Sequence, residues 1–335
     1  MDSFLRDAGM AAAIPVFVLS LFLLTKSADA LVDGAARLAG ALGMPQVVIG
    51  ATVVSLGTSL PELAAGTAAA LRGSAEFALG NAAGSVITNT SLVLGMGALL
   101  GAIPVRRENA GKVVMLAVAA LLLLVPSYGL ALMGRPVVLP QWWGALLLAG
   151  VPAYLVFAVR FGRRSAAAGG DKGARGAVRA ADVARIVLGA GGVAAFAAAM
   201  VSSASVIAAG IGVPDAVVAA TIVAVGTSAP EISTTVASAR KGMGSLALGN
   251  VVGANVLNIL LVLGAAAAVS PRGITVPAQL LRVHLPALAF ILAVFMYFVF
   301  NRSRHELNHR EGLFLVALYG LYLAGNAVLA FAAGG

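Results

Sequence analysis

The chain contains no cysteine and very little charge, and each absence excludes whole classes of protein. Without cysteine there are no disulfides, no thiolate nucleophile and no thiolate metal site. Only 10% of the 335 residues are charged, whereas about a quarter are charged in soluble domains. Because 60% of the residues are hydrophobic, a water-soluble globule could not bury all of the apolar surface. The composition therefore indicates an integral membrane protein.

Long uncharged runs recur along the chain, each close to the roughly 20 residues that cross a bilayer as a helix. We predict ten such helices, at residues 9–36, 45–71, 76–102, 112–133, 140–160, 183–210, 214–239, 245–269, 281–301 and 311–333. The predicted fold class is all-α, with ten transmembrane helices in the cell membrane, either an inner or a plasma membrane.

The net charge of +9 fits a membrane topology better than a nucleic-acid surface. If the amino terminus lies outside, 17 of the 22 Lys and Arg residues fall in connections on the inner side. Because basic residues accumulate on the cytoplasmic side of membrane proteins, we predict that both termini are external. No nucleic-acid partner is predicted, and no obligatory protein partner is evident.

Two stretches 169 residues apart carry nearly the same sequence. The block Gly-Thr-Ser-x-Pro-Glu occurs at residues 57–62 and again at 226–231, and each copy is followed at the same distance by Ala-Leu-Gly-Asn-x-x-Gly. Residues 50–100 match residues 219–269 at 22 of 51 positions without a gap. The chain therefore contains an internal duplication.

The duplication divides the chain into a first five-helix repeat at 1–160, a basic cytoplasmic linker at 161–182 and a second five-helix repeat at 183–335. Five is an odd number of crossings, so the second copy enters the membrane from the side opposite to the first. We therefore predict two inverted repeats, related by a pseudo-two-fold axis in the membrane plane, with broken helices 2 and 7 at the core.

Each repeat places a carboxylate near the middle of an apolar span, Glu62 in the first and Glu231 in the second. An ionised carboxylate at that depth costs about 2.5 to 3.5 kcal/mol. No Lys, Arg or His lies inside spans 2, 3, 7 or 8 except at their ends, so a metal ion or a proton is the expected compensating charge. The structural alternative is a pair of protonated acids that hydrogen-bond helix ends.

A proline precedes each of these glutamates and predicts a break in each helix. Pro61 and Pro230 have no amide hydrogen and crowd the carbonyl four residues earlier. The break gathers carbonyls, hydroxyls and a carboxylate within one helical turn. These hard oxygen donors, with no Cys and no His in the core, favour calcium over copper or zinc, and their flexible number suits calcium better than magnesium.

The neighbouring spans carry further polar residues at equivalent positions of one face. These positions are Asn81, Ser85 and Asn89 in span 3, and Asn250, Ala254 and Asn258 in span 8. The glycines of the two Gly-Asn-x-x-Gly blocks should let these spans approach the broken helices closely. Asn81 and Asn250 have two interpretations, as cation ligands or as amides that satisfy backbone groups freed at the neighbouring break, and the sequence does not separate them.

With these motifs the chain resembles the sodium/calcium exchanger family of the calcium/cation antiporter superfamily. The resemblance covers almost the whole chain and rests on the paired glutamate and glycine–asparagine blocks. It implies ion-coordinating residues at Thr58, Ser59, Glu62, Ser85, Asn89, Thr227, Ser228, Glu231 and Asn258, together with the backbone carbonyls of Ser55 and Ala224. It also implies that spans 1 and 6 are sliding gate helices.

The resemblance implies secondary active antiport by alternating access, in which calcium is extruded from the cell as sodium enters. No covalent cofactor is implied; calcium and sodium, or protons, are the transported ions, and the partners are inorganic cations and the lipid bilayer. Ala254 stands where the second repeat of the family usually has a serine, which removes one oxygen from a flanking sodium site. The alternative function is therefore a proton/calcium or other cation/proton exchanger.

Two other functional classes fit the residues less well. An intramembrane hydrolase would need a base beside Ser59 or Ser228, and no His or Lys accompanies them in the core. A passive channel is not favoured by inverted repeats with broken helices, which are typical of carriers. The protein is therefore predicted to be a transporter and not an enzyme. Lys26, Asp29 and Asp33, at helical spacing in span 1, are interpreted as a structural ion pair among themselves near the membrane surface.

Overall fold

The computed structural model describes residues 2–105, 110–134, 136–168, 177–211, 224–300 and 306–334. Apart from four two-residue strands, the elements in these ranges are helices, and those labelled η are π-helical. In the first half the helices are α1 (Asp2–Leu42), α2 (Gln46–Ile49), η1 (Gly50–Val54), α3 (Ser55–Thr58), α4 (Leu60–Leu71), α5 (Ala75–Thr88), η2 (Asn89–Val93), α6 (Leu94–Leu100), α7 (Ala110–Leu132) and α8 (Gln141–Ala168). In the second half they are α9 (Ala180–Gly210), α11 (Ala224–Thr227), α12 (Ala229–Arg240), α13 (Gly244–Leu257), η5 (Asn258–Leu263), α14 (Gly264–Val269), η6 (Leu280–His284), α15 (Leu285–Phe300) and α16 (His309–Gly334).

The all-helical prediction is confirmed, and the number of spans is confirmed in part. The described residues hold eight helices that are long and apolar enough to cross a membrane, or nine when the bent second segment counts as one span. The predicted span missing from this count is the seventh, 214–239, of which 214–223 lies outside the described residues. Its described part is α11 followed by α12.

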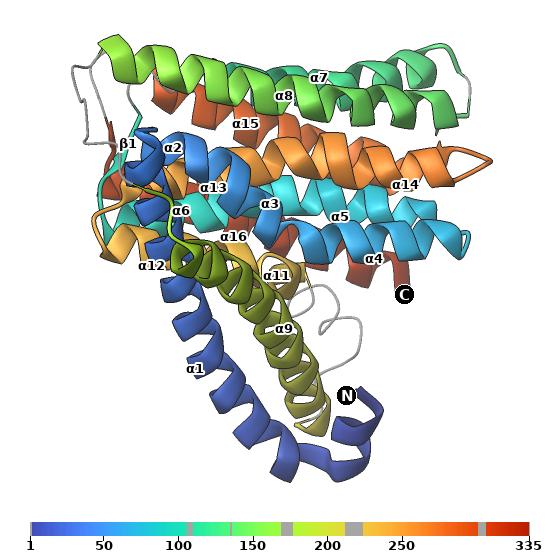
Figure 1. Ribbon diagram of the computed structural model, residues 1–335. Coiled ribbons are helices and arrows are strands. Elements are labelled where there is room, and N and C mark those ends of the chain that lie inside the picture. Colours follow the sequence, from blue (N-terminus) through green and yellow to red (C-terminus); the bar gives the residue numbers. More distant parts are fainter. Residues whose placement is uncertain are drawn as a thin grey trace.

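Helices α1 and α9 lie side by side and project together from one side of the bundle that the other helices form (Figure 1). Glycines allow this close contact. A Cβ atom added to Gly189 would lie 2.7 Å from the backbone nitrogen of Leu31, and one added to Gly34 would lie 2.9 Å from a side-chain carbon of Ile186. The two helices therefore pack closely against each other at these glycines.

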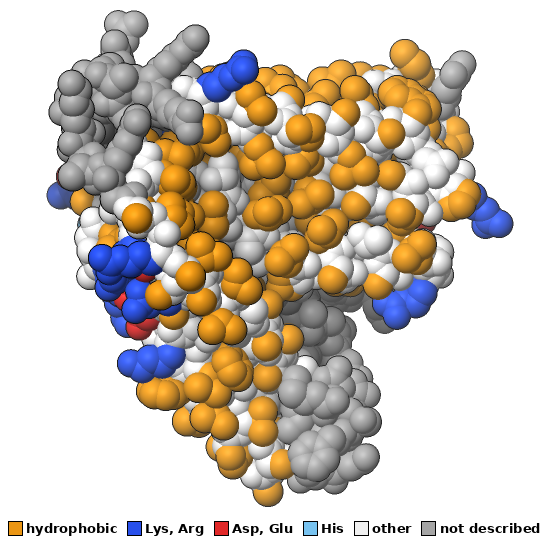
Figure 2. All heavy atoms as spheres, viewed as in Figure 1, with side chains coloured by type: hydrophobic (Ala, Val, Ile, Leu, Met, Phe, Trp, Pro, Cys, Tyr) orange, Lys and Arg blue, Asp and Glu red, His pale blue; other side chains and the backbone are white. Residues whose placement is uncertain are grey.

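The buried centre of the molecule consists of equivalent segments of the two halves. In the most apolar 18-residue stretches of 75–100 and 244–269, 72% and 83% of the residues are buried, against 17% in the corresponding stretch of α1. Outer helices instead expose large apolar side chains, such as Leu132 at 88% and Leu188 at 75%. Figure 2 shows apolar side chains spread over one face, with Lys and Arg toward its ends, as a bilayer-spanning protein requires.

Two very short antiparallel sheets connect the first half of the chain to the second. Strand β1 (Ile103–Pro104) pairs with β4 (Glu306–Leu307), and β2 (Val138–Leu139) pairs with β3 (Ile274–Thr275). Each sheet thus contains one strand from each half. The pairing fixes the connections that follow the central spans against the outer helices of the opposite half.

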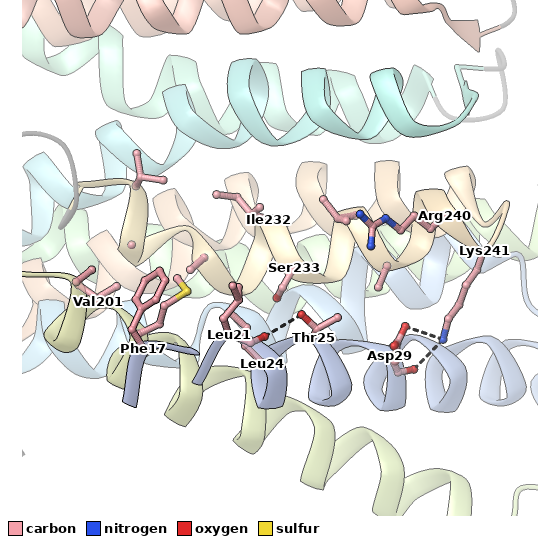
Figure 3. A pocket seen from close by; sticks show the side chains of 17 residues that line it. Phe17, Leu21, Leu24, Thr25, Asp29, Val201, Ile232, Ser233, Arg240 and Lys241 are labelled. Carbon is pink, nitrogen blue, oxygen red and sulfur yellow. Dashed lines mark hydrogen bonds and ion pairs between the residues drawn. The ribbon is translucent and has the colours of Figure 1, made fainter. Parts of the chain in front are cut away.

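An ion-pair cluster ties α1 to the end of α12. The Lys241 ammonium lies 2.8 Å from an Asp33 carboxylate oxygen and 3.1 Å from one of Asp29. Figure 3 shows Asp29 and Lys241 at one end of a mainly apolar groove of about 700 Å³ between α1, α9 and α12. The sequence prediction that Lys26 pairs with Asp29 and Asp33 is therefore wrong, because their basic partner is Lys241. The Lys26 ammonium instead lies over the ring of Phe22, 5.6 Å from its centroid.

Replacing Lys241 by Met is expected to lower the midpoint of thermal unfolding in detergent. The change leaves two neighbouring aspartates without their shared cation, and the loss should be no more than about 1 kcal/mol because the groups are partly solvated. Lys26→Met serves as the control. It removes a Lys from α1, the helix that carries both aspartates, but leaves both ion pairs of Lys241. Equal shifts in the two variants would contradict a role of Lys241 in holding α1.

Candidate cation site

Two broken helices carry the glutamates, as the prolines predicted. The α3 helix ends at Thr58 and α4 begins at Leu60, with a bend of 45° across Ser59. In the second half, α11 and α12 are separated at the equivalent Ser228. The prolines lie in the first turn of the following helix, where their missing amide hydrogen is tolerated. Each glutamate then falls in a first helical turn, where the helix dipole favours negative charge.

The two glutamates, one from each half, are both buried. Glu62 is 2% exposed and Glu231 is fully buried. They are close enough for the Glu231 carboxylate to act electrostatically on Glu62. Thr58 lies near enough to Glu231 to interact with it, although no hydrogen bond of ordinary geometry joins them. The fold thus brings together residues of the two breaks that are 169 positions apart.

Around this pair the polar side chains have an unusual shortage of hydrogen-bond partners. Folded proteins pair about 90% or more of their buried polar groups. Among the residues with described side chains, eleven carry a buried oxygen or nitrogen atom without a partner. Seven of the eleven are predicted ligands, namely Ser59, Glu62, Ser85, Asn89, Ser228, Glu231 and Asn258. Unsatisfied oxygen donors around two carboxylates form the chemical pattern of a site that receives a cation.

Asn89 and Asn258 each begin a π-helical segment inside an otherwise α-helical span. The segments are η2 and η5, at equivalent positions of the two halves. Both side chains are fully buried. A π-helical turn widens the helix and occurs mostly at functional sites. The sequence did not predict these segments, because apolar periodicity does not distinguish one wider turn from an α-helical turn.

A cavity of about 310 Å³ reaches predicted ligands of both halves. Ser85 of α5 and Thr227 of α11 both line it. Asn81, His284 and Tyr322 also contribute to its wall, and the His284 ring nitrogen lies 2.7 Å from the Tyr322 hydroxyl. Ser85 itself is only 3% exposed. The cavity therefore opens beside two predicted ligands, one from each half.

The predicted carbonyl ligands begin the short helices that precede the breaks. Ser55 is the first residue of α3, and Ala224 is the first residue of α11. The Ser55 carbonyl accepts the Ser59 backbone amide at 3.0 Å and faces the Thr58 hydroxyl at 3.3 Å. Because a carbonyl oxygen has two lone pairs, a cation would compete with the Thr58 hydroxyl for the second one.

Asn250 connects side chains of the two broken spans. Its carbonyl oxygen lies 3.4 Å from the Thr58 hydroxyl oxygen, and its amide donates to the Thr234 hydroxyl at 2.8 Å. The partners of Asn250 in the described residues are thus two hydroxyls and not the backbone groups that one interpretation of the sequence proposed. The repeat-equivalent Asn81 has an amide nitrogen without a described partner.

Glycines of α13 let it cross the first broken span in backbone contact, as predicted. A Cβ atom added to Gly253 would lie 2.6 Å from the Ser55 hydroxyl and 2.7 Å from the Ala51 backbone. One added to Gly249 would meet the Val47 carbonyl. For the equivalent glycines of the first half, the described residues provide no neighbour within 4 Å.

Sequence reasoning missed two buried polar residues of the second half, Asn255 and Thr235. The Asn255 amide donates to the Thr90 hydroxyl at 2.8 Å, whereas its carbonyl oxygen and the Thr235 hydroxyl have no described partner. Their positions in the first half hold Val86 and Gly66, so no paired motif marks them. A polar residue inside an apolar span is itself a signal, and it would have found both.

The donor set fits a hard cation. Within the described ranges no group of three or more His, Asp or Glu side chains could hold a metal ion. A cation at the breaks would therefore be held by the two carboxylates and neutral oxygens. This combination suits ions that accept six to eight oxygen donors in flexible geometry.

The chain matches one protein-family model and several known proteins over most of its length. The model of the sodium/calcium exchanger protein family matches residues 12–160 and again 182–328. The putative antiporter CaxA of Alkalimonas amylolytica is 33% identical, over 91% of this chain and 95% of its own length. The sodium/calcium exchanger MaX1 of Methanosarcina acetivorans is 29% identical, over 92% and 96%.

A solved structure shares the fold. The sodium-calcium exchanger NCX_Mj, soaked with Na⁺ and Ca²⁺, superposes with a TM-score of 0.76 at 27% identity, covering 93% of this chain and 98% of that one. Two separate matches to one family model cover most of the chain. The chain therefore belongs to the sodium/calcium exchanger family, whose members are membrane transporters rather than enzymes.

Proposed function

We propose that this protein is a secondary active antiporter that exports calcium in exchange for sodium by alternating access. The observation that carries the proposal is the buried pair of Glu62 and Glu231, each at a helix break and surrounded by oxygen donors without partners. Two carboxylates supply the charge that balances one divalent cation. The names of the relatives MaX1 and NCX_Mj support calcium and sodium as the exchanged ions.

The proposed ligands come from both halves. They are the side chains of Glu62, Glu231, Thr58, Thr227, Ser59, Ser228, Ser85, Asn89 and Asn258, with the backbone carbonyls of Ser55 and Ala224. Calcium takes six to eight oxygens at about 2.3 to 2.6 Å, so a subset of these donors is sufficient. The remaining donors would serve sodium ions in flanking positions when calcium has left.

The proposed topology has ten spans in two inverted repeats, at 1–160 and 183–335, with both termini outside and the basic linker 161–182 in the cytoplasm. The separate match of each half to one family model supports the duplication. The position of 17 of the 22 Lys and Arg residues supports the orientation. The crosswise strand pairs, one strand from each half, agree with a pseudo-symmetric arrangement.

The electrostatics of the site suggest how exchange is coupled. A site with two ionised carboxylates is costly to occlude without a cation, because the charges must leave water unpaired. Calcium, or several sodium ions, would neutralise them and permit the site to face the other side. Helices α1 and α9, which pack on each other outside the bundle, are the proposed moving elements.

One observation favours a second candidate, a proton/calcium or other cation/proton exchanger. Ala254 is fully buried and offers no hydroxyl, whereas the equivalent Ser85 does. The second half therefore has one oxygen fewer for a sodium ion. Protons need no such oxygen, since a carboxylate alone accepts them.

Calcium uptake into proteoliposomes should be driven by an outward sodium gradient and should change little with a pH gradient at constant sodium. Uptake that ignores sodium but follows the pH gradient would reject sodium as the counter-ion in favour of protons. Ala254→Ser restores the missing hydroxyl and is expected to lower the sodium concentration needed for half-maximal exchange. Uptake that depends on neither gradient would contradict antiport.

A further inference from the structure

Asn250 lies next to the proposed site without belonging to its ligand set, and its contacts have a defined direction. The Thr234 hydroxyl donates to the Pro230 carbonyl at 2.9 Å. Its oxygen then accepts the Asn250 amide at 2.8 Å, so the carbonyl end of Asn250 must point to Thr58. All three side chains are at most 1% exposed, so water does not compete for these bonds.

The Thr58 hydroxyl has one proton and two acceptors within reach. The Ser55 carbonyl is 3.3 Å away and the Asn250 carbonyl is 3.4 Å away. If the proton goes to Ser55, it occupies the second lone pair of an oxygen whose first lone pair already accepts the Ser59 amide. If the proton goes to Asn250, the Ser55 carbonyl keeps a lone pair free.

From this geometry we infer that Asn250 is a positioning residue that raises cation affinity. Its side-chain carbonyl does so by accepting the hydrogen bond of the Thr58 hydroxyl. The Thr58 oxygen and the Ser55 carbonyl then both present lone pairs to a cation between the glutamates. The inference rests on the proposed function, because it assigns Asn250 a role toward ligands of the proposed site. It extends that function to a residue that does not itself touch the ion.

The sequence of the first repeat lacks one part of this arrangement. The position equivalent to Thr234 is Ala65, whose side chain cannot accept an amide. In agreement, the amide nitrogen of Asn81 has no partner in the described part of the chain. The contact between Asn250 and Thr234 therefore has no side-chain counterpart at the equivalent position of the first repeat, although the ligand motifs are repeated.

The test is a double-mutant cycle between Asn250→Ala and Thr58→Val, read by equilibrium binding of radioactive calcium to the purified full-length protein in detergent. Asn250→Ala in the wild-type background is expected to raise the Kd for calcium about 3- to 10-fold, the value of one hydrogen bond. In the Thr58→Val background the same change should alter the Kd by less than about twofold, because no hydroxyl remains to be oriented. Equal effects in the two backgrounds, or no effect in the wild type, overturn the inference.

Two further variants separate positioning from general damage. Thr234→Val removes the oxygen that orients the Asn250 amide, and it should raise the Kd for calcium by a smaller factor than Asn250→Ala does. This variant tests the inference if the Asn250→Ala protein does not fold. Ser127→Ala deletes a buried hydroxyl of α7 that bonds only within its own helix, at 2.7 Å to Leu123, and should leave the Kd unchanged. A wild-type protein that does not bind calcium would reject the proposed function, whereas normal wild-type binding with an unchanged Asn250→Ala would reject only the role of Asn250.

Discussion

Glu62→Gln or Glu231→Gln is expected to abolish calcium uptake into proteoliposomes while the protein remains folded. Each change removes one of the two buried carboxylates of the proposed calcium site. At an effective dielectric constant of about 20, a unit charge pair at about 4 Å is worth about 4 kcal/mol, so the affinity for calcium should fall by more than about a hundredfold. Gln retains the size and one oxygen of Glu, so packing at the breaks should be kept.

The control for these variants is Glu76→Gln, which neutralises an exposed carboxylate in the first turn of α5. It should transport calcium as the wild type does. Thermal unfolding measured without calcium should show no loss of stability in Glu62→Gln or Glu231→Gln, because a neutral amide is less costly to bury than an unpaired carboxylate. Wild-type uptake by either variant would falsify the assignment of that glutamate.

Gly249→Val is expected to have a large structural effect on α13. The added side chain would meet the Val47 carbonyl and lie 3.0 Å from the Ala51 backbone nitrogen. Backbone atoms of a neighbouring helix cannot turn away as a side chain can, so α13 must separate from α2 and η1. Overpacking of this kind costs about 1 to 3 kcal/mol or more, and it displaces Ser55 and Thr58 from the site.

Gly320→Ala is the matched control, because Gly320 lies on the exposed surface of α16 and an added Cβ has no described neighbour within 4 Å. It should be neutral or slightly stabilising, since Ala favours a helix over Gly by about 1 kcal/mol. Size-exclusion profiles and thermal unfolding in detergent distinguish the two variants. A monodisperse Gly249→Val protein with wild-type stability would show that α13 does not need this glycine.

Several elements of the site followed from sequence because their causes are local. Pro61 and Pro230 determine where each helix breaks, since the missing amide hydrogen acts on the same turn. The depth of Glu62 and Glu231 within apolar segments predicted buried acids, and both are buried. The glycines of α13 predicted close approach, because only a missing side chain permits backbone contact.

Other features did not follow, because they depend on which segments become neighbours. The sequence did not predict that the Asn250 side chain contacts the hydroxyls of Thr58 and Thr234, which belong to two different helices. Lys241 lies 208 residues beyond Asp33, and only the fold makes it the partner of α1. The wider turns at Asn89 and Asn258 leave the apolar pattern unchanged, so no periodicity reveals them. Long-range pairing therefore limits what a single sequence can specify.

The crosswise strand pairs have a consequence for how much of the molecule can shift as a unit. The two strand pairs, β1 with β4 and β2 with β3, connect one half of the chain to the other, and neither pair includes α1 or α9. A displacement of α1 together with α9 therefore breaks no hydrogen bond between strands. A rotation of one half relative to the other would strain both strand pairs. If α1 moves relative to α12 as proposed, the ion pairs of Lys241 with Asp29 and Asp33 would have to break.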